Sequence, residues 1–147
     1  MSPAHETEYA DIIRIDSLDY SRYTIKQNPL SLVLELVYGI KDKPYWQKSY
    51  KAHWTINDDK LFLRNIISKD ARFSYKQLFS TEMDEIGNPK KILANWYSGT
   101  LTIELKSSRR TIDSSIYDLI KERHYTICKG RVTEFTDTFS EILLPPF

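Results

Sequence analysis

Strict alternation of apolar and polar residues recurs along this chain, and it restricts the folds that the chain can adopt. Every second residue is apolar in TLTIEL (residues 100–105) and in YKAHWTI (residues 50–56). Successive side chains of a β-strand point to opposite faces, so this period is typical of strands with one buried face. Aromatic residues make up 13% of the chain, and they also favour such half-buried pleated surfaces.

Turn residues divide the alternating segments into hairpins. Asn57-Asp58-Asp59-Lys60 separates predicted strands at 49–56 and 61–67, and Lys129-Gly130 separates strands at 124–128 and 131–135. Further strands are expected at 9–15, at 20–26 and within 92–105. Residues 30–38, LSLVLELVY, are apolar on both faces of a strand, which predicts a central strand.

Helical signals are sparse. Residues 74–79 predict a short helix with Ser74 as its N-cap, and residues 106–115, KSSRRTIDSS, predict an exposed polar segment. The spacing of Ile116, Leu119 and Ile120 fits a helix, but Tyr117 and Leu119 also fit a strand. Residues 113–123 are therefore left open between helix and strand.

These segments predict one mainly β (α+β) domain spanning residues 1–147. Seven to nine short strands favour a curled antiparallel sheet or a partly open barrel with one or two short helices. The net charge of +1 provides no general field for nucleic acid. The chain shows no secretory signal, no apolar stretch long enough to span a membrane and only one cysteine, Cys128; we therefore expect a cytoplasmic location.

Catalytic and metal-binding patterns are weak. Ser98 lies in WYSGT, which lacks the first glycine of a nucleophile elbow, and the four glycines are too scattered to form a phosphate loop. His124 and Cys128 would lie ~13 Å apart along a strand, too far to bind one metal. We therefore expect no enzyme activity, metal or cofactor.

Binding candidates come from exposed aromatic and basic residues. Tyr45 and Trp46 lie among lysines in a predicted loop, and His53 occupies the polar side of its strand. Arg109 and Arg110 belong to the polar segment that follows the strand at 100–105. Aromatic residues and arginines are enriched at protein-binding hot spots, so we expect these five residues to contact a partner.

Two patterns resemble a group of small uncharacterised bacterial proteins, many of immunity type. They are W-x-I-x-x-x-x-L-x-L from Trp54 to Leu63 and A-x-W-Y-S-G-T-L-x-I from Ala94 to Ile103, with a weaker match at 127–132. The resemblance covers roughly residues 50–132 and carries no catalytic residue. It implies a cytoplasmic immunity protein that forms a heterodimer with a cognate toxin and occludes the toxin's active site.

Other functions remain open at this point. A barrel could bind a small ligand in a pocket lined by Trp54, Trp96 and Tyr97. A single-stranded nucleic-acid binder would combine the loop lysines with Tyr45 and Trp46. An enzyme whose residues meet only in three dimensions is a further alternative.

Overall fold

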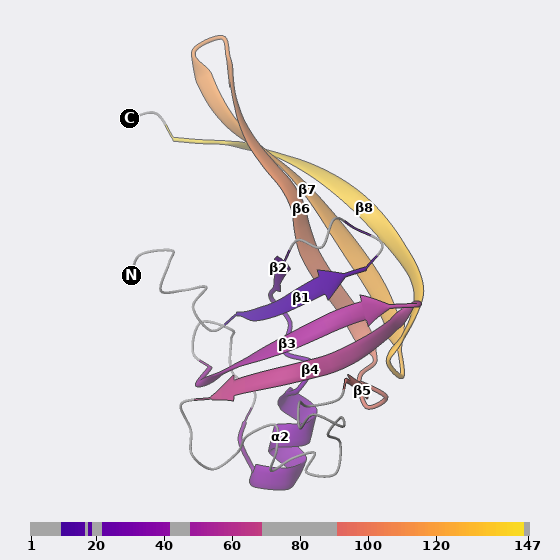
Figure 1. The fold of residues 1–147 in the computed structure, drawn as a ribbon. Coiled ribbons are helices and arrows are strands. Elements are labelled where there is room, and N and C mark those ends of the chain that lie inside the picture. Colours follow the sequence, from indigo (N-terminus) through magenta and orange to yellow (C-terminus); the bar gives the residue numbers. More distant parts are fainter. Residues whose placement is uncertain (1–9, 17, 19–21, 42–47, 69–90, 146–147) are drawn as a thin grey trace.

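The described part of the chain forms a closed seven-stranded β-barrel with one short helix (Figure 1). The computed structural model describes residues 10–16, 18, 22–41, 48–68 and 91–145. Strands follow one another around the barrel in the order β3-β1-β2-β6-β7-β8-β4 and close through β3–β4 pairing. Their bounds are β1 Asp11–Ile15, β2 Arg22–Ile25, β3 Tyr50–Asn57, β4 Lys60–Ser68, β6 Gly99–Ile112, β7 Ser115–Cys128 and β8 Arg131–Leu143, while the short β5 Ile92–Leu93 pairs with β4. The predicted mainly β barrel is thus confirmed, although β1 pairs with β3 in parallel.

Three hairpins close through two-residue turns in the left-handed region. Asp58 and Asp59, Asp113 and Ser114, and Lys129 and Gly130 all have positive φ, the backbone of a type I′ turn. The predicted hairpins at 57–60 and at 129–130 are confirmed. The third turn joins β6 to β7. Residues 106–112, predicted as an exposed polar segment, are largely exposed but belong to strand β6, and residues 115–123, left open between helix and strand, are strand.

The predicted central strand at residues 30–38 is wrong, because helix α2 covers Ser31–Tyr38. Leu30 and Leu34 are buried one turn apart, so a helical stripe, rather than one face of a strand, contacts the core. Gly39 ends the helix at φ +68°, with its N–H donating to Glu35 O at 2.9 Å and the Ile40 N–H donating to Leu34 O at 3.3 Å. Helices commonly end at a glycine in this left-handed conformation, so Gly39 was the signal for a helix in the sequence. The helix predicted at 74–79 lies outside the described residues.

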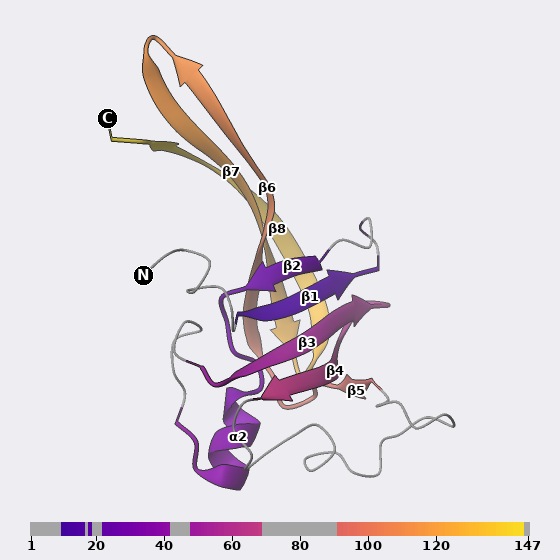
Figure 2. The same ribbon diagram turned by 60° about the vertical axis from the view of Figure 1, so that its left-hand side comes forward.

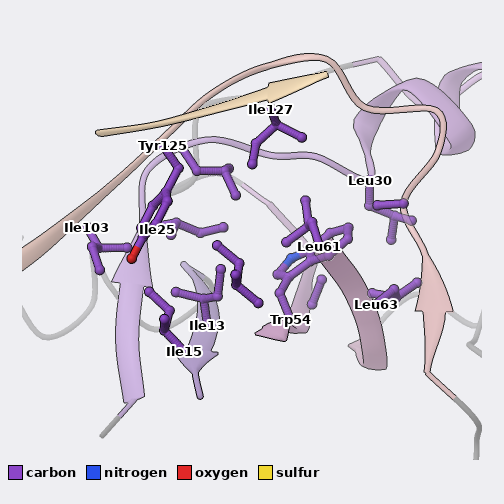
Figure 3. Packing of buried hydrophobic residues seen from close by; sticks show 14 of the residues in the cluster. Ile13, Ile15, Ile25, Leu30, Trp54, Leu61, Leu63, Ile103, Tyr125 and Ile127 are labelled. Carbon is purple, nitrogen blue, oxygen red and sulfur yellow. The ribbon is translucent and has the colours of Figure 1, made fainter. Parts of the chain in front are cut away.

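Buried side chains of β1, β2, β3, β4, β6, β7 and α2 fill the barrel interior, and the partly buried Val132 of β8 packs against them (Figure 3). The inward residues of β3 are Tyr50, Ala52, Trp54 and Ile56, as the alternation predicts. Ile13, Leu61 and Ile103 meet them there and are fully buried. No helix in the described part of the chain has the length and apolar character needed to cross a membrane.

A charged pair is buried inside this apolar core. The Lys48 ammonium donates a hydrogen bond to the Asp11 carboxylate, and both side chains are almost wholly shielded from solvent. The Ala52 N–H and the Trp54 Nε1–H donate to the two Asp11 oxygens, each at 2.9 Å. Burial raises the pKa of the Asp11 carboxyl, while Lys48 and the two N–H donors oppose that rise. The carboxylate therefore links β1, the start of β3 and the largest core side chain.

Replacing Asp11→Asn is expected to lower the free energy of unfolding by about 3–5 kcal/mol, because the Lys48 ammonium would stay buried without an anion. The double variant Asp11→Asn/Lys48→Met should recover part of that loss, since no charge remains and the Asn oxygen can still accept hydrogen bonds. Urea denaturation of both variants checks this. Equal losses in the two variants would contradict it.

Gly130→Ala is expected to destabilise the fold more than Gly39→Ala. Both glycines have positive φ, which disfavours alanine by about 1–2 kcal/mol. A Cβ at Gly130 would also lie 2.7 Å from Ala94 O, whereas nothing lies within 4 Å of a Cβ at Gly39. Urea denaturation gives the free energy of unfolding of each variant, and the difference between Gly130→Ala and Gly39→Ala measures the cost of the steric contact with Ala94. Equal values for the two variants would show that the chain around Ala94 moves aside.

Candidate functional site

Strands β6, β7 and β8 extend beyond the barrel as a three-stranded ribbon (Figure 2). We call residues 104–123 and 135–143 the arm. Only Ile103 of β6 pairs with β2, and only Arg131 of β8 pairs with β4. Both edges of the arm therefore lack a neighbouring strand within the described structure. The arm exposes two faces, and we call the one that continues the barrel interior its inner face.

Exposed apolar side chains gather on the inner face. The pairing register places alternate residues on it, and Tyr125, buried in the core, faces Phe135 at 5.7 Å between ring centroids. Five large hydrophobic residues of β6 and β8 are exposed in the described structure. Ile112, Phe135, Phe139 and Leu143 belong to the inner face, and only Ile142 belongs to the outer face. Such clustering is typical of an interaction surface.

Cationic side chains surround these apolar residues. The inner face carries four cations and two anions: Lys106, Arg110, Lys121, Arg123, Asp137 and Glu141. Arg123 donates two hydrogen bonds to Asp137, at 2.7 and 3.1 Å, and this contact lowers the pKa of the Asp137 carboxyl. The Arg123 guanidinium also lies 4.2 Å from the centroid of the Phe135 ring. The inner face therefore keeps an excess of positive charge beside its aromatic groups.

A shallow hollow of about 380 Å³ lies in the middle of the inner face. Leu119 and Phe139 provide apolar wall, and Lys106, Arg110, Lys121 and Glu141 provide charged groups. This mixture resembles the buried centre and charged rim of protein-binding surfaces.

The structure separates the residues that the sequence grouped as partner contacts. Arg110 belongs to the inner face, whereas its neighbour Arg109 belongs to the outer face and pairs with Asp118 at 3.0 Å. The two arginines therefore cannot both lie under one flat partner. His53 lies on a different surface, and Tyr45 and Trp46 lie outside the described residues.

His53 lines a second pocket, of about 370 Å³, on the outer side of β1, β2, β3 and β4. Its Nε2 atom is buried and makes no hydrogen bond. Burial lowers the pKa of His53, and the positive charges of Lys51 and Arg22 lower it further, against a smaller opposite effect of Asp11. The His53 side chain is thus half-buried.

Trp54, Trp96 and Tyr97, the predicted lining of a ligand pocket, have structural contacts. Trp54 is buried in the core, with its ring centroid 6.4 Å from that of Trp96. Trp96 donates its indole N–H to Pro29 O at 2.7 Å, and Tyr97 donates its hydroxyl to Thr100 O at 2.8 Å. Burial raises the pKa of Tyr97 to about 12. The three aromatic residues thus anchor the turn that leads into β6.

The weak catalytic candidates also have partners. Ser98 Oγ accepts the Lys129 N–H at 2.9 Å and thereby fixes the β7–β8 turn. His124 lies between Thr102 and Thr138, whose hydroxyls are 2.9 and 2.8 Å from its ring nitrogens. Within the described ranges, no three His, Cys, Asp or Glu residues gather closely enough to hold a metal ion.

Sequence reasoning missed the apolar residues of the arm. Their signal was the spacing of Phe135, Phe139 and Leu143, which share one parity in RVTEFTDTFSEILL, residues 131–144.

Comparisons with models of protein families, with curated proteins and with solved structures find no match for this chain.

The free energy of unfolding is expected to rise with pH through the region just below about 6.5, the ordinary pKa of histidine. The pKa of His53 is lowered in the folded protein, so the unfolded chain binds the proton more readily and acid favours unfolding. His53→Gln should weaken this dependence, and His124→Gln, which keeps His53, should retain it. Denaturation midpoints measured across that pH range test the assignment; an unchanged slope in His53→Gln would refute it.

Proposed function

We propose that this chain is a non-enzymatic binding protein that holds a protein partner against the inner face of the arm. The observation that carries this proposal is the sidedness of the exposed hydrophobic residues. The exposed residues Ile112, Phe139 and Leu143 lie on the same face of the ribbon, and no second layer of described residues covers them. Covering them would remove apolar surface from water, which favours association.

The charges on the two faces of the arm indicate which kind of partner would bind. The inner face has an excess of cations, whereas the outer face carries Glu104, Asp118 and Glu122 against Arg109. An acidic partner surface would be attracted to the inner face and repelled by most of the outer one. Two copies related by a two-fold axis would place cations against cations, so a different, acidic protein fits this surface better than a second copy.

The shape of the arm supports occlusion as the mode of action. Its narrow ribbon projects away from the barrel (Figures 1 and 2), and such an element can enter a concave site on another protein. The resemblance to immunity-type proteins makes a cognate bacterial toxin the partner that we propose, with its active site covered in a heterodimer. Phe139, which is 76% exposed, would be the central anchor.

Phe139→Ala is expected to weaken partner binding by at least about 2 kcal/mol, the loss typical of an aromatic hot spot. Ile142→Ala is the matched control, because Ile142 is exposed on the opposite face of the same strand. The partner would be captured from the native bacterium by the tagged wild-type protein, identified by mass spectrometry and titrated calorimetrically against both variants.

Three results would contradict the proposal. One is equal affinity of wild type and Phe139→Ala for the captured partner. Another is a larger loss from Ile142→Ala than from Phe139→Ala. The third is stable self-association of the purified chain that Phe139→Ala abolishes, because a second copy would then be the occupant of the inner face.

A further inference from the structure

We propose that the pocket containing His53 is a binding site for a small phosphate-bearing molecule, separate from the partner surface of the arm. The pocket lies on the outer side of β1 to β4, on strands that contribute nothing to the arm. Its lining includes Arg14, Arg22, Arg64 and His53, together with Asn57 and Asn65. Four strands thus bring three guanidinium groups and the polar side chains of His53, Thr55, Asn57 and Asn65 to one hollow.

No described carboxylate forms an ion pair with any of the three arginines, Arg14, Arg22 and Arg64. Arg14 and Arg22 are direct neighbours across the β1–β2 ladder, and like charges in this arrangement destabilise a sheet. Among the described lining residues, Asp16 is the single carboxylate, so one negative charge faces three guanidinium groups. In a cluster with such an excess of positive charge, a bound anion can supply the missing negative charge.

A β-bulge contributes the third arginine. His53 pairs with Asn65 and Trp54 pairs with Leu63, so Arg64 is the extra residue of β4. A bulge changes the direction of a side chain, and bulges are frequent beside functional sites. Here the bulge lets two consecutive residues, Arg64 and Asn65, both line the outer pocket while Leu63 and Ile66 stay buried.

His53 adds a polar group whose hydrogen-bonding capacity is unused. Its Nε2 atom is buried at the pocket wall without a partner, which is unfavourable for a polar atom. The charged groups that act on His53 are Lys51 of β3, Arg22 of β2 and Asp11 of β1. A bound anion would offset the repulsion from Lys51 and Arg22, and a turn of the imidazole ring would give the anion a further donor.

The dimensions favour a small molecule over a polymer. A volume of about 370 Å³ falls in the range of small-ligand pockets. Guanidinium groups match phosphate oxygens with two parallel hydrogen bonds. A nucleic-acid strand would need a basic groove that follows several nucleotides, whereas these cations converge on one hollow in a chain of net charge +1.

Calorimetric titration of the full-length protein with sodium pyrophosphate at low ionic strength tests the proposal. Arg22→Gln and Arg64→Gln should each raise the dissociation constant by about tenfold or more, as the loss of a charge-assisted hydrogen bond implies. Arg131→Gln, which changes an exposed arginine outside the lining, should leave the dissociation constant within about twofold. The melting temperature of ligand-free Arg22→Gln should equal or exceed that of the wild type, because the variant relieves the repulsion with Arg14.

Four outcomes would overturn the proposal. The first is no detectable binding of pyrophosphate by the wild-type protein. The second is binding that Arg22→Gln and Arg64→Gln leave unchanged, and the third is equal weakening by Arg131→Gln. The fourth is tighter binding of a thymidine decanucleotide than of pyrophosphate with the same dependence on Arg22 and Arg64, which would assign the pocket to single-stranded nucleic acid.

Discussion

The buried carboxylate of Asp11 is the interaction on which the barrel core depends. Its two oxygens accept hydrogen bonds from the Lys48 ammonium, the Ala52 N–H and the Trp54 indole. The parallel pairing of β1 with β3 places these donors around it. A hydrophobic residue at this position could fill the space, but it would leave the indole and amide donors without an acceptor. The carboxylate thus specifies which residues of β3 lie beside β1 and how the Trp54 ring is oriented.

Alternation alone predicted most of the strands, because their inward residues repeat with period two. It failed at α2, where Leu32, Leu34, Leu36 and Tyr38 also have that period. The burial of Leu30 and Leu34 shows that contact with the core favours a helix in this segment, and the left-handed glycine after Tyr38 ends that helix. The arm was only partly predicted. Residues 113–123 were left open between helix and strand, because Asp113-Ser114 is not a usual pair for a turn with positive φ at both residues. The strand at residues 106–112 was missed because the polar residues of an exposed ribbon resemble those of a loop.

The proposed binding surfaces were less predictable than the fold. His53 and Arg110 were identified by residue type, and each lines a hollow. Their separation onto different surfaces depends on the closure of the barrel, and no local sequence pattern predicts that closure. Asp11 and Lys48 were recognisable in principle, since each shares the parity of the buried residues that follow it: Ile13 and Ile15 after Asp11, and Tyr50 and Ala52 after Lys48. A charged residue at a position whose alternation predicts an inward side chain was the signal that sequence reasoning missed.

The two narrow junctions of the barrel have a consequence for how the chain acquires its structure. Among the described residues, one pair joins β2 to β6 and one joins β4 to β8, whereas the pairings within β1 to β4 and within β6 to β8 are extensive. Each half is therefore made of strands that are close in the sequence, which reduces the loop entropy lost before its contacts form. The first four strands can pair during synthesis before residue 99 emerges from the ribosome. Formation of the barrel then requires only the docking of a second preformed sheet along two short junctions.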